Sequence, residues 1–185
     1  MAKKNNQKLV VLAVTASIAA YKACEVIRAL QKKQIDVTVI MTEASKKFIT
    51  PLSLASLSGR RVYSDMFADS SDWEMEHISL AQKADLFLVA PATANIIGKM
   101  AHGIADDLVS CVALTTKAPI VIAPAMNTAM YQNKIVQENI EKLKARGIKF
   151  IDPIKGKLAC GTTGEGHLAE VDTIVKKVFA LLKNR

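Results

Sequence analysis

Cysteine and aromatic residues are scarce in this sequence of 185 residues, and each scarcity excludes a class of protein. The three cysteines, Cys24, Cys111 and Cys160, lie far apart, so their spacing predicts neither a disulfide framework nor a zinc site. Aromatic residues make up 5% of the chain, too few for a row of rings on which nucleic-acid bases stack. The net charge of +8 therefore indicates a solvated basic surface, which suits an anionic small molecule better than a nucleic acid.

Long apolar runs are absent as well. The longest, such as residues 9–13 and 86–91, fall well short of the roughly 20 residues that a membrane-spanning helix needs. The basic residues 1–7 lead directly into a patterned segment, with no small-residue cleavage site after them. We expect a cytoplasmic protein without a membrane span, built as a single domain over residues 1–185 with a short basic tail at residues 1–7.

Short apolar runs alternate with stretches of helical periodicity. The pattern predicts strands over 8–14, 36–41, 85–90, 118–124 and 148–151, and helices over 17–33, 77–82, 95–116, 133–146 and 170–183. The strands are almost continuously apolar, as is typical of parallel strands buried on both faces. Residues 42–76 are less periodic and predict short helices and loops. The predicted fold class is α/β, a Rossmann-like doubly wound parallel sheet.

Ligands bind such sheets at the carboxyl ends of the strands, so the segments that follow the strands are the candidate sites. After the first strand, Ser17 opens a helix, where free backbone N–H groups favour a phosphate; Ser17 would also serve as a plain helix cap. After the third strand, Thr93 and Asn95 stand among small residues, and Thr93 likewise would serve only as a cap.

Three further residues are candidates for chemistry. Asn127 follows a strand that ends in proline, and its amide both donates and accepts hydrogen bonds. Cys160 lies in a glycine-rich segment, where we expect a mobile loop that closes over a pocket with the thiol as proton donor or nucleophile. His77 opens a short helix, and its position alone favours a surface or cap residue over a base.

Taken together, the motifs resemble the homo-oligomeric flavin-containing cysteine decarboxylases, and within that family the phosphopantothenoylcysteine decarboxylases. The resemblance spans residues 9–170, in a specific order and spacing. The motifs that carry it are TASIAAYK at 15–22, HISLA at 77–81, ADLFLVAPATAN at 84–95, HGIADDL at 102–108, PAMNTAM at 124–130 and ACG at 159–161.

The resemblance implies a flavoprotein fold and the decarboxylation of 4'-phosphopantothenoylcysteine to 4'-phosphopantetheine in coenzyme A biosynthesis, through a thioaldehyde and an enethiolate. The residues implied as FMN contacts are Ala16, Ser17, Ile18, Thr42, Thr93, Ala94, Asn95, Ile96 and Ala125. Those implied for the substrate are Met126, Asn127, Lys157, Leu158 and Ala159, with a substrate flap over residues 152–169. His77 is implied as the catalytic base, Cys160 as the acid and Asn127 as the group that holds the substrate carboxylate.

The family also implies a phosphorylated substrate, a homo-oligomer (a trimer or a dodecamer) with FMN and His77 near a subunit interface, and a separate phosphopantothenoylcysteine synthetase as a partner. The sequence departs from the family pattern at Ala16, Tyr131 and His167, where glycine, tryptophan and arginine are common. Alternatives within the fold are a peptidyl-cysteine decarboxylase that stops at the enethiol, a non-catalytic flavin-binding regulatory subunit, and a flavin prenyltransferase. Cys160 favours the full reaction, because an enzyme that stops at the enethiol needs no such acid.

Overall fold

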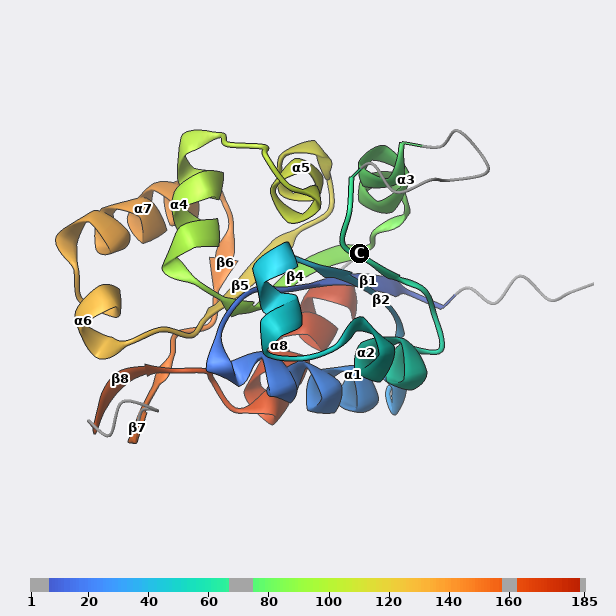
Figure 1. The fold of residues 1–185 in the computed structure, drawn as a ribbon, viewed down its shortest axis with the longest axis horizontal. Helices are drawn as coiled ribbons and strands as arrows, with labels where there is room; N and C mark the ends of the chain where they lie inside the picture. The colour runs from blue at the N-terminus through green and yellow to red at the C-terminus, as the bar shows by residue number, and fades with distance from the viewer. Residues whose placement is uncertain (1–6, 67–74, 158–162, 184–185) are drawn as a thin grey trace, which may run out of the picture.

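A six-stranded parallel sheet forms the centre of the computed structural model, which describes residues 7–66, 75–157 and 163–183. The strand order is β3-β2-β1-β4-β5-β6, the order of the dinucleotide-binding sheets (Figure 1). The strands are β1 (Leu9–Val14), β2 (Asp36–Met41), β3 (Val62–Tyr63), β4 (Leu86–Ala92), β5 (Ile120–Pro124) and β6 (Lys149–Phe150). The predicted fold class is confirmed.

Helices cover both faces of the sheet (Figure 1). One face carries α1 (Ala23–Gln31), α2 (Pro51–Ser58) and α8 (Val171–Lys183), and the other carries α3 (Glu76–Lys83), α4 (Ala94–His102), α5 (Leu108–Thr115) and α7 (Lys134–Ala145). Each face buries its own apolar cluster, because neighbouring strand residues alternate sides: Leu12 packs toward α1 and α8, whereas Val11 packs toward α4 and α5. Within the described part of the chain, no helix is both long enough and apolar enough to cross a bilayer.

The single helix expected over 95–116 is wrong. It is divided into α4 and α5, because Gly103 ends α4 with a φ of 72° and Asp107 begins α5 through a capping box with Ser110. The helix expected over 17–33 begins with a 3-10 segment, η1 (Ile18–Lys22), before α1.

Residues 42–76 do contain the short helices that we expected, namely η2 (Glu43–Lys47) and α2, together with the first residue of α3. They also hold the edge strand β3, which the sequence did not predict because two residues give no periodicity.

The loop expected in the glycine-rich segment is wrong for residues 163–166, which belong to a strand. Within the flap residues 152–169, strands β7 (Ile154–Lys157) and β8 (Thr163–His167) form an antiparallel ribbon, separate from the main sheet. Residues 158–162, with Leu158, Ala159 and Cys160, lie outside the described residues. A four-residue helix, α6 (Thr128–Tyr131), packs against β8.

Candidate functional site

The candidate site lies where the strand order reverses, beyond the carboxyl ends of β1 and β4. The chain leaves β1 toward α1 on one face and leaves β4 toward α4 on the other, so the loops diverge and leave space between them. Two adjoining hollows occupy this edge, with volumes of about 480 and 510 Å³. Both volumes are within the range of roughly 300–1,000 Å³ that is usual for small-molecule pockets.

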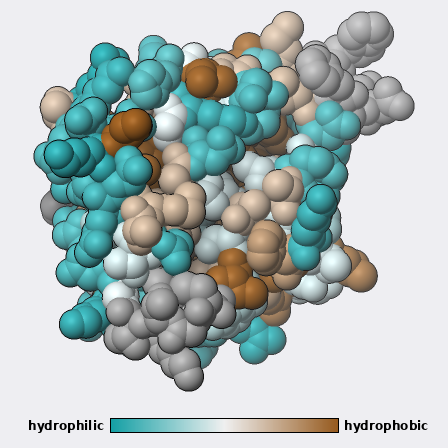
Figure 2. All heavy atoms as spheres, turned by 60° about the vertical axis from the view of Figure 1, so that its left-hand side comes forward, coloured by the Kyte–Doolittle hydropathy of each residue, from teal (hydrophilic) through white to brown (hydrophobic). Residues whose placement is uncertain are grey.

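We name the hollows after one residue in each, and Ala16, Thr93 and Met130 line both. The Asn127 hollow is lined by Ala16, Ser17, Ile18, Ala19, Tyr21, Lys22, Phe48, Thr93, Ala94, Ala125, Met126, Asn127, Met130, Gly166, His167 and Leu168. The Thr42 hollow is lined by Thr15, Ala16, Thr42, Glu43, Ala44, Thr93, Asn95, Ile96, Lys99, Asp107 and Met130. Every residue expected to contact FMN lines one hollow or the other. In Figure 2, apolar and intermediate residues gather in the middle of this side of the molecule, with hydrophilic residues around them.

Hydroxyl groups join the two strand ends. Thr15 Oγ1 donates to the carbonyl oxygen of Pro91 at 2.7 Å, and accepts from the backbone N–H of Thr93 at 3.1 Å. Thr93 Oγ1 in turn caps α4 by accepting from the N–H of Ile96 at 3.4 Å. The prediction that Thr93 caps a helix is therefore confirmed. The same hydrogen bonds hold Thr93 in position where it lines both hollows.

Ser17 is likewise a helix cap, because its Oγ accepts from the N–H of Ala19 at 3.3 Å. Its neighbour Ala16 stands where the family commonly has glycine. Among the described non-glycine residues, Gln34 alone has a positive φ, so the backbone at Ala16 does not require glycine.

The buried hydroxyl group of Thr42 indicates that the site suits a polar cofactor. Its Oγ1 is buried in the wall of the Thr42 hollow and has no hydrogen-bond partner among the described residues. Such a group costs free energy unless a ligand pairs with it. A phosphate or a ribityl hydroxyl of FMN would supply that partner, so the residues present fit the cofactor.

Lys99 and its two carboxylate partners were missed by the sequence reasoning. Lys99 Nζ lies 2.7 Å from Oδ1 of Asp106 and 2.7 Å from Oδ2 of Asp107. Burial opposes both charges, yet these hydrogen bonds raise the pKa of Lys99 and, with those from Ser110, lower the pKa of Asp107. The cluster ties the end of α4 to the start of α5 beside the Thr42 hollow. The sequence does contain a signal for this arrangement. Gly103 is typical of a helix end, and Asp107 with Ser110 three residues later is typical of the start of the next helix.

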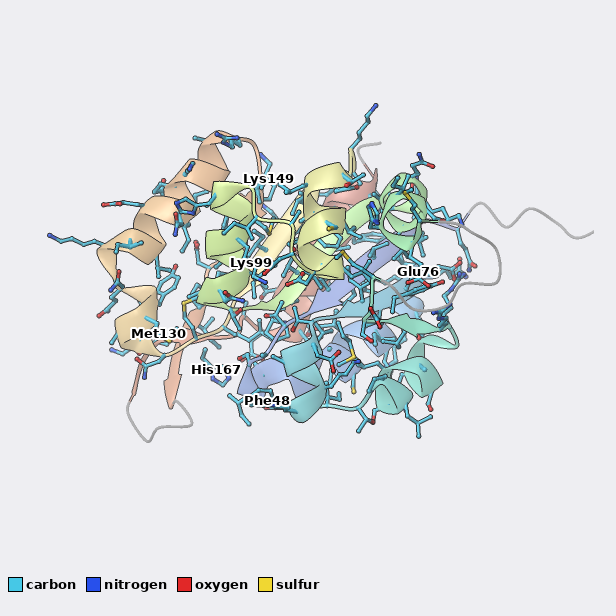
Figure 3. The ribbon with its side chains drawn as sticks, turned by 45° about the horizontal axis from the view of Figure 1, so that its top comes forward. Phe48, Glu76, Lys99, Met130, Lys149 and His167 are labelled. Atoms are coloured by element: carbon cyan, nitrogen blue, oxygen red, sulfur yellow. The ribbon has the colours of Figure 1, made fainter. Side chains whose placement is uncertain are left out.

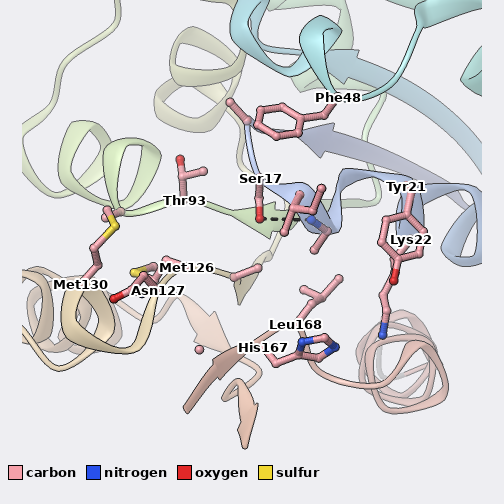
Figure 4. Close-up of a pocket in the computed structure, with 16 residues that line it drawn as sticks. Ser17, Tyr21, Lys22, Phe48, Thr93, Met126, Asn127, Met130, His167 and Leu168 are labelled. Atoms are coloured by element: carbon pink, nitrogen blue, oxygen red, sulfur yellow. Dashed lines mark hydrogen bonds between the residues drawn. The ribbon is translucent and has the colours of Figure 1, made fainter. Parts of the chain in front are cut away.

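Asn127 is the N-cap of α6 and lies in the wall of the Asn127 hollow, beside Met126 (Figure 4). Its Oδ1 accepts from the N–H of Ala129 at 2.8 Å, so the amide presents its NH₂ end as the donor. Strand β8 lies directly alongside, since the N–H of Met126 donates to the carbonyl oxygen of Gly166 at 2.9 Å. A Cβ at Gly166 would lie 2.2 Å from the carbonyl oxygen of Met126, so only glycine permits this approach.

Lys22 and His167 lie on the other side of the same hollow, away from Asn127 in the view of Figure 4. Both side chains are half-buried. His167 is the flap residue at which the family commonly has arginine, and the structure places it in the wall of the hollow. Tyr131, the other departure from the family pattern, lines neither hollow. Burial, aided by the carboxylates of Asp152 and Glu165, raises the pKa of Tyr131.

His77 is not brought to the site by its own chain. It lies on α3, which packs against α5, and it lines neither hollow. Lys157 ends β7, while Leu158, Ala159 and Cys160 lie outside the described residues.

Comparison with known proteins identifies the family. The family model described as "Flavoprotein" matches residues 1–183. The chain belongs to the flavoprotein family. Within this family, it is 49% identical over 173 residues to a probable phosphopantothenoylcysteine decarboxylase of Streptococcus mutans, covering 92% of this chain and 97% of that protein.

Another flavoprotein relative is the coenzyme A biosynthesis bifunctional protein of Bacillus subtilis, 46% identical over 171 residues. That match covers 92% of this chain but 42% of the bifunctional protein, so the chain spans less than half of that relative.

Solved structures of flavoproteins agree in fold. A PPC decarboxylase mutant complexed with pantothenoylaminoethenethiol superposes with a TM-score of 0.89 at 31% identity, over 96% of this chain and all of that one. The FMN-binding protein AtHal3 superposes with a TM-score of 0.86 at 31% identity, over 97% of this chain and 99% of that one.

Proposed function

We propose that this flavoprotein is an FMN-dependent decarboxylase that converts 4'-phosphopantothenoylcysteine into 4'-phosphopantetheine. The observation that carries the proposal is the clustering of the expected FMN contacts at the topological switch point, with Asn127 in the wall of the adjoining hollow. The Streptococcus mutans and PPC decarboxylase relatives support the same reaction.

The cofactor is held at the ends of β1, β2 and β4. The backbone at residues 16–18 and the hydroxyls of Ser17 and Thr42 bind its phosphate and ribityl chain, while Thr93 to Ile96 and Ala125 support the rest. When bound, FMN supplies reversible hydride acceptance at the substrate carbon that bears sulfur, which makes loss of carbon dioxide chemically accessible.

The substrate occupies the Asn127 hollow with its two anionic ends apart. The NH₂ group of Asn127 donates to the carboxylate that is lost, and Met126 packs beside it. Lys22 and His167, across the hollow, contact the phosphorylated end. Lys157, Leu158 and Ala159 are assigned to the substrate on the family resemblance alone.

Proton transfer is assigned to His77 and Cys160. His77 takes the thiol proton of the substrate, and Cys160 protonates the carbon left after carbon dioxide departs. Protonation at this carbon gives the saturated thiol only if the hydride that FMN would have accepted is returned to the carbon that bears sulfur, so the complete reaction has no net redox change. Without Cys160 the reaction ends at the enethiol and the flavin would stay reduced.

Assembly brings His77 to the site. His77 lies on α3 rather than in a hollow, so the base for each site comes from a neighbouring copy of the chain. Exposed apolar side chains in both regions are consistent with such head-to-tail contact: Ile18 and Phe48 line the Asn127 hollow, and Met75 and Leu114 lie at the start of α3 and in α5. Different surfaces in contact close into a ring when the rotation permits, which supports the expected trimer, or a dodecamer built from trimers.

The synthetase that makes the substrate is a separate partner in this proposal. The Bacillus subtilis relative is bifunctional and extends well beyond the region that this chain matches. The cytoplasmic location expected from the sequence stays a prediction.

The test gives the purified, FMN-loaded protein 4'-phosphopantothenoylcysteine and follows carbon dioxide and thiol product. We expect both from the wild type. From Cys160→Ser, assayed without oxygen, we expect carbon dioxide and enethiol in amounts no greater than the amount of flavin, which stays reduced. Cys24→Ser is the matched control, because Cys24 lies in α1 and lines neither hollow. Absence of carbon dioxide from the wild type would refute the proposed function.

A further inference from the structure

Glu76 is a buried carboxylate to which the proposed reaction gives no role. Its side chain is 9% exposed, and neither carboxylate oxygen accepts a hydrogen bond from the described residues. Its carboxylate forms an ion pair with Arg61, whose Nη2 lies 3.0 Å from Oε1. Removing a carboxylate from water is unfavourable unless its partners compensate for the lost hydration. Stability alone therefore does not explain why a carboxylate is buried at position 76, and we looked for a functional role.

Arg61 belongs to the edge of the sheet. It directly precedes β3, and its guanidinium carbon lies 4.8 Å from the centre of the Tyr63 ring. Tyr63 pairs with Ile40 of β2 and packs against the apolar cluster beneath α3 and α5. The contact with the Tyr63 ring, which packs against the core, therefore restricts the position of the Arg61 guanidinium. Figure 3 shows Glu76 at the foot of α3, beside the strands.

The start of α3 has little else to define it. Met75 stands at the N-cap position and makes no side-chain cap hydrogen bond. Glu76 is the first helical residue, where a negative charge also interacts favourably with the helix dipole. His77 is the next residue, so its backbone moves with that of Glu76.

From these contacts we infer that Arg61 and Glu76 form a positioning pair for His77. The pair clamps the first turn of α3 to the edge strand and so sets where the imidazole stands relative to the site that it serves. The inference rests on the proposed function, in which His77 is the base. It predicts that removal of the Glu76 charge slows turnover without weakening the binding of flavin or substrate.

The test compares Glu76→Gln, Arg61→Met and Arg61→Lys in the FMN-loaded protein. We expect kcat to fall about 10- to 100-fold in the first two, because misplacement of a catalytic group by about 1 Å has effects of this size. KM and flavin content stay unchanged, and Arg61→Lys keeps most of the activity. Amide hydrogen exchange of residues 76–83 accelerates in the variants that lose turnover.

Arg60→Met is the matched control. Arg60 is adjacent in the chain and also forms an ion pair, 2.6 Å to Oδ2 of Asp36, but this pair does not involve α3. Its kcat and the exchange of residues 76–83 stay at the wild-type values. Equal losses of kcat in Arg60→Met and Arg61→Met would overturn the inference, since the effect would then be general destabilisation.

Further outcomes separate this inference from the proposed function. If His77→Asn abolishes turnover while Glu76→Gln keeps the wild-type kcat, the positioning role is refuted and the proposed function stands. If His77→Asn keeps full turnover, His77 is not the base and the inference falls. If the wild type releases no carbon dioxide, both the function and the inference are refuted.

Discussion

Thr42 carries a buried hydroxyl that the described chain leaves without a partner, at the point where the cofactor is proposed to bind. We predict that Thr42→Val weakens FMN binding about tenfold, because a hydrogen bond to a charged group contributes about 1.5 kcal/mol or more. The free energy of unfolding of the flavin-free protein stays the same or rises, since valine removes an unpaired polar group. Fluorescence titration of flavin-free protein with FMN measures the first effect and urea unfolding the second.

Thr115→Val provides the comparison for Thr42→Val. Thr115 Oγ1 donates to the carbonyl oxygen of Cys111 within α5, and Thr115 lines neither hollow. FMN affinity should be unchanged in this variant. An equal loss of affinity in both variants would contradict the assignment of Thr42 to the cofactor.

Asp107 gives the protein a predictable response to acid. Its pKa is lowered in the folded state, so the stabilisation from its ionised form is present above the ordinary value of 3.8 and is lost as the pH falls through the lower folded-state pKa. We predict that Asp107→Ala lowers the free energy of unfolding at pH 7 by about 2 kcal/mol, through loss of the cap and of the bond to Lys99. Urea unfolding between pH 7 and pH 2 measures this, and the variant should show the weaker loss of stability below pH 4.

Asp106→Ala should cost less than Asp107→Ala. Asp106 also contacts Lys99, but its side chain is 58% exposed, and exposed ion pairs contribute at most about 1 kcal/mol. If both substitutions destabilise the protein equally, the cap of α5 is not the source of the effect.

Residue by residue, the sequence predicted what local chemistry determines. Ser17 and Thr93 are caps because small hydroxyl residues at the end of a strand accept from the first N–H groups of a helix. The contact between Arg61 and Glu76 was not predictable, because it joins residues 15 positions apart whose proximity depends on how α3 docks.

At the scale of elements, the position of the flap depends on Gly164 and Gly166. Because neither has a side chain, β8 can lie directly against residues 126–128. We predict that Gly166→Ala displaces β8 and lowers kcat/KM about 100-fold, because φ is 134° there and a Cβ would overlap the carbonyl oxygen of Met126. Flavin content should be retained, because Gly166 is not among the expected FMN contacts, although it lines the Asn127 hollow. Steady-state kinetics with 4'-phosphopantothenoylcysteine and the flavin absorbance measure the two effects.

Gly156→Ala is the control within the same ribbon. A Cβ at Gly156 would meet the side chain of His167 at 3.5 Å, an ordinary contact, so this variant should keep nearly normal kinetics. If it fails as severely as Gly166→Ala, the ribbon tolerates no added side chain anywhere, and the specific contact with Met126 is not the reason.

The sequence predicted the long elements and missed the breaks between them. The strands are continuous apolar runs, and α7 and α8 lie within one or two residues of their expected bounds. The break between α4 and α5 was missed because both helices are largely apolar, so their combined periodicity hides the turn at Gly103. The ribbon of β7 and β8 was missed because a glycine-rich sequence has no alternation of apolar and polar residues.

At the scale of the whole molecule, the proposed function takes His77 from a neighbouring chain, so that two chains form each site. We predict that His77→Asn and Asn127→Asp, each inactive alone, recover roughly a quarter of the wild-type activity when unfolded together and reassembled in equal amounts. A site is active when its hollow comes from the His77→Asn chain and its base from the Asn127→Asp chain. Each of these events has a probability of one half in a random mixture, so a quarter of the sites are active. Size-exclusion chromatography with light scattering confirms reassembly, and activity that stays absent in the mixed oligomers would contradict a shared site.

The two outermost strands of the sheet have a consequence for how copies associate. β3 and β6 contain two residues each, and Arg60, Arg61 and Lys149 stand at or beside them. Short edges with positive charges offer little unpaired backbone to a second sheet, which protects a protein against edge-to-edge aggregation. The apolar parallel sheet is therefore shielded at both edges, and in the proposed oligomer the contacts between copies would fall on helices and loops rather than on strand edges.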